Sequence, residues 1–374
     1  EKTGTYGLQI SRGDYFVDVF LRGLILNLDE SRPYARQSPC SLTDVGNDKT
    51  TGESHAGCFE ACLERGIENY REVLAENVIP FVSECAIMGP CSLHGLTRMF
   101  PKDKIWPMNE YWSDRLMDNP YSAVLMDFPT REKRYAEFLY GECKNVRDFI
   151  AKGMTAHAET LRAEIEYARF NEDKCGGFMN WMYSDIWPSA TWAVVDYYLE
   201  PKQAYYQMKK SYAPVLLTYV DTKDGLNLAL INDTQKILTA KITYGEKTLD
   251  GRVLRSDFID ATVEGGSVFG KIVNKETQEK NSYLFAEAVI GGEKVTTVFS
   301  SAMWRNCKFN GDYSYTVRTE KGKIAVTFKA NSFVKGISLS LPDNYKNEYK
   351  DNYFDMQKAD EKTISVTDFS KETK

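Results

Sequence analysis

Phe81-Val82-Ser83-Glu84-Cys85-Ala86-Ile87-Met88 is a short apolar run that carries a single carboxylate. It leads through a loop into a helical pattern, as a buried parallel strand does before its helix. An ionised carboxylate on such a strand is costly without a partner. At the carboxyl end of a strand in a parallel βα fold, Glu84 can serve as nucleophile or general acid/base. The alternative is a structural ion pair at the strand end.

The sequence before Pro214 repeats this strand-then-helix order. Residues 15–28 are amphipathic, and helical spacing recurs in Tyr135, Phe138, Leu139, Val146, Phe149 and Ile150, and again in Ala158, Leu161, Ile165 and Ala168. A closed eight-unit barrel needs about 250 residues. Residues 1–213 therefore predict the second half of a (β/α)8 barrel, with four strands near residues 34–39, 51–55, 80–85 and 178–185.

The composition changes at Pro214, because eleven of the twelve prolines and five of the six tryptophans lie at or before it. Beyond it, apolar residues alternate with period two between turn signals such as Asp224-Gly225, which is typical of short antiparallel strands. We expect two immunoglobulin-like β-sandwich domains, residues 214–305 and 306–374, so that the whole chain is multidomain.

Charge and composition restrict the partners. A formal net charge of −6 without a basic run argues against nucleic acid. No run of eighteen apolar residues predicts a membrane span, and no signal peptide is evident, although the chain begins at Glu1 rather than Met. The eight cysteines form no CxxC pair, which favours free thiols in a reducing compartment such as the cytoplasm.

An aromatic cluster, Trp181 to Trp192, follows the last strand-like run. Three indoles around Asp185 suit a sugar site, since apolar sugar faces stack on aromatic rings, but core packing explains them as well. A zinc site at His55 with Cys91 or His94 is a further alternative, whose spacing matches no established pattern. Motifs for nucleotide binding and for serine hydrolases are absent.

Five segments, in order, resemble the β-mannosidase and exo-β-glucosaminidase branch of glycoside hydrolase family 2. The similarity runs nearly end to end. It is carried by Leu28-Asp29-Glu30-Ser31-Arg32-Pro33-Tyr34 with Ser38-Pro39, by Gly52-Glu53-Ser54-His55, by Phe81-Val82-Ser83-Glu84, by Trp181 to Trp192 with Asp196-Tyr197-Tyr198, and by Asp351-Asn352-Tyr353-Phe354-Asp355.

The resemblance implies a retaining exo-β-glycosidase with Glu84 as nucleophile. The acid/base of the family ends an Asn-Asn-Glu motif on the fourth barrel strand, and Glu1 would be that residue. The residues implied to bind the terminal sugar are Ser38, His55, Trp181, Asp185 and Trp187. The implied partner is an oligosaccharide or glycoside, no metal or other cofactor is needed, and the oligomeric state is open.

Departures from the family pattern leave the sugar open. The usual Ser-Glu-Phe-Gly is Ser83-Glu84-Cys85-Ala86 here, and Met182 and Ser184 replace a Gln and an Asn of the last-strand motif. β-Mannoside, β-glucosaminide and β-galactoside all remain candidates. The rival from another class is a non-catalytic carbohydrate-binding protein.

Overall fold

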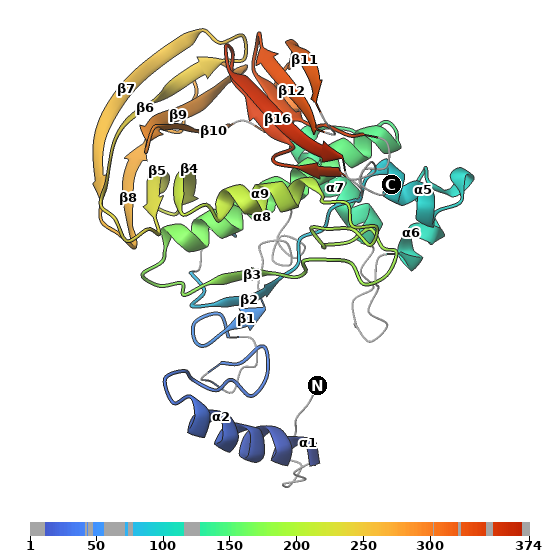
Figure 1. The fold of residues 1–374 in the computed structure, drawn as a ribbon, viewed down its shortest axis with the longest axis vertical. Coiled ribbons are helices and arrows are strands. Elements are labelled where there is room, and N and C mark those ends of the chain that lie inside the picture. Colours follow the sequence, from blue (N-terminus) through green and yellow to red (C-terminus); the bar gives the residue numbers. More distant parts are fainter. Residues whose placement is uncertain are drawn as a thin grey trace.

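The computed structural model describes residues 12–41, 43, 48–55, 72–73, 78–115, 128–301, 303–320, 323–341 and 347–368. Its elements run from an N-terminal helix through a small parallel sheet and a helical layer to antiparallel sheets, in the order that the sequence predicted (Figure 1). The predicted combination of βα units followed by β-structure is thus observed. No described helix has the length and apolar composition to cross a bilayer.

The N-terminal helix is continuous through α1 (Arg12–Tyr15), the π-helical η1 (Phe16–Leu21) and α2 (Arg22–Leu28). It lies below the rest of the molecule in Figure 1. The helix buries none of the described side chains in η1 and α2. Its large apolar side chains are 40–78% exposed, namely Tyr15, Phe16, Val19, Phe20, Leu24, Ile25 and Leu28. The helix is observed over the predicted residues, and the described residues of the chain leave its apolar face largely exposed.

The strand predicted at residues 34–39 is wrong. These residues form bends, and only the next one, Cys40, makes a bridge, to Glu53. Pro33 and Pro39 bound the segment and cannot donate to a strand ladder. The Tyr34 hydroxyl instead donates to the Val17 carbonyl at 2.9 Å, which ties the segment to the helix.

Three short parallel strands form the centre of the N-terminal part. They are β1 (Ser54–His55), β2 (Val82–Cys85) and β3 (Phe178–Asn180), in the order β1-β2-β3. His55 is in register with Glu84, and Cys85 with Asn180, so the three carboxyl ends meet at one edge. The strand predicted over 178–185 ends early, because the chain turns after Trp181 and pairs with its own residues 194 and 195.

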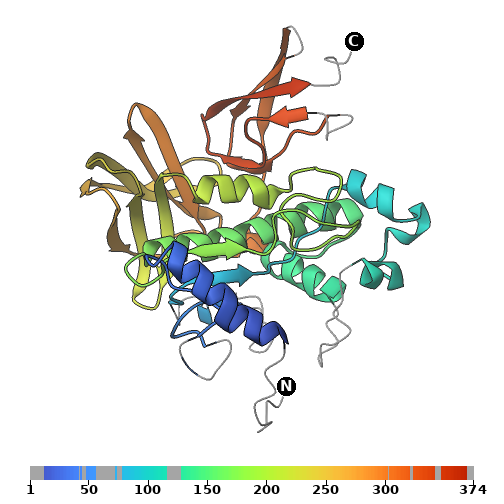
Figure 2. The ribbon, with the colours of Figure 1, turned by 60° about the horizontal axis from the view of Figure 1, so that its bottom comes forward.

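A helical layer covers this sheet on the side facing the β-structure (Figure 2). Its longest member is α8, whose predicted apolar face at Leu161 and Ile165 packs against Val82 and Cys85 of β2. The Asn145 side chain begins α8 by accepting a hydrogen bond from the Asp148 N–H. The layer comprises α5 (Leu93–Met99), η3 (Lys102–Lys104), α6 (Glu110–Asp114), α7 (Phe128–Tyr140), α8 (Val146–Phe170) and α9 (Gln203–Ser211).

After Pro214 two antiparallel sheets pack face to face. One contains β4 (Val215–Thr222), β5 (Gly225–Asn232) and β8 (Ser267–Val273); the other contains β10 (Glu293–Phe299), β9 (Ser282–Ile290), β6 (Leu238–Thr248) and β7 (Val253–Val263). The sequence predicted alternation along β5, yet both faces are buried from Leu226 onward, because Ala229 packs against Tyr167 of α8.

The C-terminal part has a sheet with the order β11 (Tyr313–Glu320), β12 (Lys323–Ala330), β16 (Glu361–Asp368), β14 (Asn347–Tyr349). A pair, β13 (Val334–Ile337) and β15 (Phe354–Met356), packs on its inner face. The alternating residues of β12 point into this core at Val326 and Phe328, whereas Tyr315 and Val317 of the edge strand β11 are more than half exposed.

Candidate active site at the strand ends

His55 and Glu84 lie side by side at the carboxyl ends of β1 and β2. The Nε2 atom of His55 is 3.6 Å from Oε2 of Glu84, and each side chain is 30% exposed. A carboxylate that reaches solvent beside an imidazole can attack or bind a ligand, whereas a buried ion pair cannot. The structure thus brings two of the residues predicted for the site into contact.

Ser38 connects this pair to a second carboxylate. Its hydroxyl donates to Oε2 of Glu53 at 3.1 Å and lies 2.9 Å from Nε2 of His55. It is also 3.4 Å from the hydroxyl of Ser83, the residue before Glu84. Three predicted site residues, Ser38, His55 and Glu84, therefore form one polar chain that ends at Glu53.

The local backbone explains why Glu53 reaches Ser38. The Glu53 N–H donates to the Cys40 carbonyl at 3.0 Å in an antiparallel bridge, which brings the segment after Ser38 alongside β1. Gly52 makes the approach with φ at +70°, and a Cβ there would lie 2.2 Å from the Cys40 oxygen. Only glycine fits this position.

The strand behind the site is held through Cys85. Its thiol donates to Oε2 of the buried Glu164 on α8 at 2.6 Å, and its carbonyl accepts from the Trp181 N–H at 2.9 Å. Trp181 follows β3 at the same edge of the sheet and is 45% exposed. An exposed indole at the edge of the sheet where the carboxylate of Glu84 also lies suits a sugar ring.

Asp185 and Trp187, unlike the exposed Trp181, are held in the packed loop that follows β3. Asp185 is 5% exposed, and its Oδ1 accepts hydrogen bonds from Ser189 at 2.8 Å and Thr191 at 2.9 Å. Its Oδ2 is 3.9 Å from the ammonium of Lys202. Trp187 is partly buried beneath the guanidinium of Arg115, 5.5 Å from the ring centroid. In this arrangement Asp185 holds its own loop together and does not face the open strand ends.

Glu1, the predicted acid/base, lies outside the described residues. The residues predicted as alternative zinc ligands lie in other surroundings. His94 Nδ1 contacts the Glu200 carboxylate, and the Cys91 side chain is fully buried in the core. Among the described residues, no three histidine, cysteine or acidic side chains are grouped as metal ligands.

Sequence reasoning missed Glu53. A signal was present, because Glu53 and His55 are two residues apart where a strand begins, and side chains at that spacing share a face. The role of Lys202 had no such signal. Its partners Gly89, Asp185 and Thr191 come from different segments of the chain.

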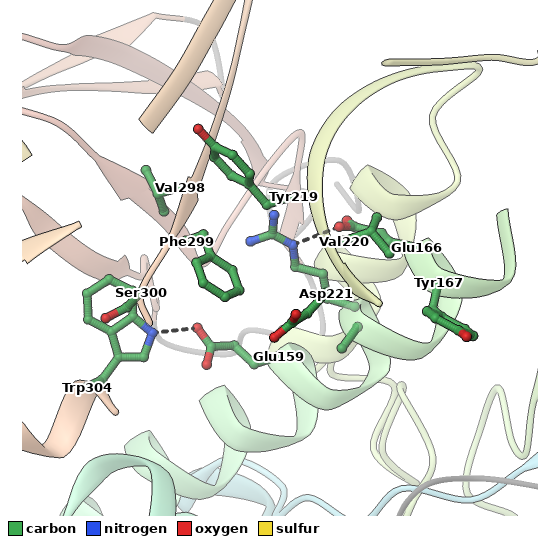
Figure 3. Close-up of a pocket in the computed structure, with 12 residues that line it drawn as sticks. Glu159, Glu166, Tyr167, Tyr219, Val220, Asp221, Val298, Phe299, Ser300 and Trp304 are labelled. Atoms are coloured by element: carbon green, nitrogen blue, oxygen red, sulfur yellow. Dashed lines mark hydrogen bonds and ion pairs between the residues drawn. The ribbon is translucent and has the colours of Figure 1, made fainter. Parts of the chain in front are cut away.

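Away from the strand ends, a cavity lies at the junction of α8 with the β-structure. This cavity, drawn in Figure 3, measures about 90 Å³ and is lined by residues of α8, β4, β10 and the Trp304 turn. Arg162 Nε is 3.1 Å from the Glu166 carboxylate, and the Trp304 indole donates to Glu159 at 3.1 Å. No predicted site residue lines this cavity, so it belongs to the joint between parts of the molecule.

Comparison with known proteins places these features in a family context. Residues 310–374 match an Ig-fold domain model of the mannosidase type. β-Mannosidase B of Thermothelomyces thermophilus is 23% identical over 408 aligned positions that include 96% of this chain, and exo-β-D-glucosaminidase of Amycolatopsis orientalis is 31% identical over 27% of it. The crystal structure of β-D-mannosidase from Dictyoglomus thermophilum superposes on 95% of the chain with a TM-score of 0.80 at 18% identity.

The chain spans less than half of these proteins: 45% of the Thermothelomyces relative, 10% of the Amycolatopsis relative and 43% of the Dictyoglomus structure. The matches nevertheless agree in family, and they confirm the resemblance that the five motifs predicted.

Proposed function

We propose, from the relationship of this chain to the β-mannosidase and exo-β-glucosaminidase branch of glycoside hydrolase family 2, that it carries the nucleophile of a retaining exo-β-glycosidase. The observation that carries this proposal is Glu84 itself. It lies one residue before the end of the central strand of a parallel sheet, it is open to solvent, and His55 lies 3.6 Å away. The relatives named above are glycoside hydrolases by name, which supports the same reading.

The proposed reaction is a double displacement. Glu84 attacks the anomeric carbon while a second carboxylic acid protonates the leaving oxygen, and that residue then takes a proton from the water that releases the sugar. Retention needs the two carboxyl groups about 5–5.5 Å apart. Glu1 remains our prediction for the second group. Both proton transfers are carried by carboxyl groups, so the scheme needs no metal or organic cofactor.

The sugar-binding residues of this scheme surround the strand ends. Ser38 and His55 would contact the sugar beside Glu84, and Trp181 would stack on its apolar face. Asp185 and Trp187 would reach the sugar only if their loop opened from its present packing. A terminal β-mannoside is our first candidate, with β-glucosaminide and β-galactoside as alternatives, and a purely sugar-binding role as the rival.

We further propose that residues 1–213 are the C-terminal half of a (β/α)8 barrel, followed by sandwich domains 214–305 and 306–374. Two features support the half-barrel. The described sheet has three parallel strands, and parallel sheets are buried on both faces in known folds. Within the described part of the chain, the apolar face of the helix over residues 12–28 stays exposed. Strands and helices from elsewhere in the complete polypeptide would close the barrel, and activity would belong to the closed form.

The test is hydrolysis of aryl β-mannoside, β-glucosaminide and β-galactoside by this chain and by the complete reading frame that encodes it. Product stereochemistry is followed by proton NMR. We expect one substrate to be preferred with retention, and Glu84→Gln to lower kcat by at least about 10³-fold while sugar binding persists. The matched control Glu110→Gln alters an exposed glutamate whose side chain is 72% accessible, and should keep full activity.

Two results would contradict the proposal. Unchanged turnover in Glu84→Gln would exclude it as nucleophile. Sugar binding without hydrolysis of any of the three substrates, by the folded complete protein, would favour the non-catalytic role.

A further inference from the structure

We propose that Glu53 is a positioning residue that fixes His55 in the tautomer with a proton on Nε2, facing the carboxylate of Glu84. It acts through the Ser38 hydroxyl and touches neither Glu84 nor the sugar. The assignment of a purpose to this proton rests on the proposed function of Glu84, whereas the tautomer itself does not.

The groups in this chain differ in the protons that they can donate. An ionised carboxylate only accepts hydrogen bonds, and a serine hydroxyl has one proton to give. Ser38 is 3.1 Å from Oε2 of Glu53 and 3.4 Å from the Ser83 hydroxyl. Nε2 of His55 lies closer, at 2.9 Å, but Glu53 is the charged acceptor among the three contacts, and hydrogen bonds to an ionised acceptor are the stronger ones, so Glu53 takes the Ser38 proton.

His55 must then be the donor in its contact with Ser38. The Ser38 oxygen has only lone pairs left to offer, and Nε2 of His55 lies 2.9 Å from it. A hydrogen bond at that distance requires a hydrogen on Nε2. The same nitrogen is 3.6 Å from Oε2 of Glu84, so its N–H lies beside the nucleophile.

This direction matters for Glu84. An N–H next to the ionised carboxylate stabilises it, whereas the lone pair of the other tautomer would repel it. The 3.6 Å separation is longer than a hydrogen bond, and catalytic contacts of this kind often tighten only when substrate binds. Glu53 thereby determines that Nε2 of His55 presents an N–H, and not a lone pair, to the carboxylate of Glu84.

The position of Glu53 is built into the backbone. The bridge to Cys40 and the glycine-only turn at Gly52 hold it against Ser38. Its second oxygen, Oε1, is buried and accepts no hydrogen bond from the described residues. Ser38 is its one side-chain hydrogen-bond partner among the described residues, so this half-buried carboxylate directs its charge at the Ser38 hydroxyl.

Nitrogen-15 NMR of the histidine side chains in the full chain tests the tautomer directly. The sequence contains only three histidines, so a His55→Asn variant assigns the His55 signals by difference. At about pH 8, where an ordinary imidazole is neutral, we expect His55 to show a protonated Nε2 and an unprotonated Nδ1.

Glu53→Gln should reverse the direction of both hydrogen bonds of Ser38. The new side-chain amide N–H donates to the Ser38 oxygen, and the Ser38 hydroxyl is then free to donate to Nε2 of His55. The Nδ1-protonated form of His55 should then become measurably populated, by at least about threefold over the parent. Ser38→Ala should do the same, whereas Ser38→Thr keeps the hydroxyl and should keep the parent tautomer. Glu110→Gln and Ser113→Ala, both on the exposed face of α6 (Glu110–Asp114), are the matched controls.

A second experiment measures kcat/KM of the complete protein on the preferred aryl glycoside. Glu53→Gln should lower kcat/KM by about tenfold, the worth of one charge-assisted hydrogen bond, whereas the exposed control Glu110→Gln should keep the kcat/KM of the parent. Circular dichroism verifies that each variant is folded.

The outcomes separate the two proposals. An Nδ1-protonated His55 in the parent, or an unchanged tautomer in both Glu53→Gln and Ser38→Ala, overturns the inference even if Glu84→Gln is inactive. A tautomer shift in Glu53→Gln in a protein that hydrolyses no glycoside supports the inference and removes the proposed function.

Discussion

Lys202 shows how a single residue can decide the shape of a loop. Its side chain is 1% exposed, and its ammonium donates to the carbonyls of Gly89 at 3.0 Å and Thr191 at 2.8 Å. Asp185, 3.9 Å away, balances the charge. A buried ammonium is tolerated only with such partners, and here they bind the loop of the last-strand motif to the segment after β2.

Lys202→Met should destabilise the chain by about 3–5 kcal/mol, because Asp185 would keep a buried charge without its counter-ion. The measurement is urea unfolding followed by tryptophan fluorescence. Lys174→Met, at a lysine whose side chain is 64% exposed, is the control and should change stability by less than about 0.5 kcal/mol. A loss below about 1 kcal/mol in Lys202→Met would show that the pair is not needed to hold the loop.

Gly52 and Gly23 predict opposite effects of the same substitution. Gly52→Ala combines a positive φ with a Cβ against the Cys40 carbonyl, so we expect a cost of about 1–3 kcal/mol and a broken Ser38–Glu53 contact. Gly23→Ala lies in α2 with nothing within 4 Å of the new Cβ and should stabilise the helix by about 0.5–1 kcal/mol. Thermal unfolding of both variants checks the pair, and equal effects would refute the argument.

At the scale of elements, the packing of α7 against α8 buries two titratable groups. Glu132 of α7 is 2% exposed and His157 of α8 is fully buried, and neither has a hydrogen-bond partner for its polar side-chain atoms among the described residues. Burial raises the pKa of Glu132 to about 8, although Lys202 opposes the shift. Burial also holds the pKa of His157 well below its usual value.

The raised pKa of Glu132 predicts a pH dependence with a definite sign. Its contribution to stability is fully present below the ordinary pKa of 4.5 and is lost as the pH rises through about 8. Glu132→Gln stays neutral, so relative to the parent it should gain more than about 1 kcal/mol of unfolding free energy between pH 5 and pH 8. Urea titrations at the two pH values measure this, and parallel behaviour of both proteins would refute it. Because each comparison is made within one pH, the opposite trend of His157 cancels.

At the scale of the whole molecule, α8 and α9 form a platform on which the β-structure rests. Lys335 of β13 reaches Glu159 of α8 at 2.8 Å and Asp355 of β15 at 3.2 Å, and Lys210 of α9 lies 3.4 Å from Asp351. These charges line a cavity of about 350 Å³ between the parts. The segment Asp351 to Asp355, one of the five family motifs, therefore acts in this joint and not at the strand ends.

Acid should loosen this joint. Burial alone would raise the pKa of Asp355, but Lys335 and the Gly336 N–H outweigh it and hold the pKa below the ordinary 3.8. The stabilisation is present above 3.8 and is lost as the pH falls through the lowered value. Asp355→Asn should cost about 1–3 kcal/mol at pH 7 and less at pH 3.

Thermal unfolding at both pH values measures this difference, and Asp260→Asn on the exposed face of β7 is the control. A cost for Asp355→Asn that is the same at pH 3 as at pH 7 would show that its charge does not hold the joint.

The sequence by itself determined the elements whose signal is local. Apolar runs sufficed for β2 with Glu84, and helical spacing sufficed for the part of α8 from Ala158 to Ala168, because each depends on which faces of a segment are apolar. The spacing from Tyr135 to Ile150 did not show that the helix stops at Tyr140 and a new one begins at Val146. Period-two alternation sufficed for the strands after Pro214. The motifs were also sufficient to predict the resemblance to the β-mannosidase and exo-β-glucosaminidase branch that the comparisons support. The strand predicted at residues 34–39 was wrong, because Pro33 and Pro39 bound a segment whose apolar pattern is weak, and proline cannot donate to a strand ladder.

Only the tertiary structure decided which of these residues meet. Ser38 reaches Glu53 and His55 through a bridge at Cys40, Asp185 is withdrawn by Lys202, and β5 is buried on both faces because α8 covers it. Hydrogen bonds and ion pairs act over a few ångströms, whatever the separation along the chain. Their partners are chosen when distant segments pack, and periodicity in one segment carries no information about that choice.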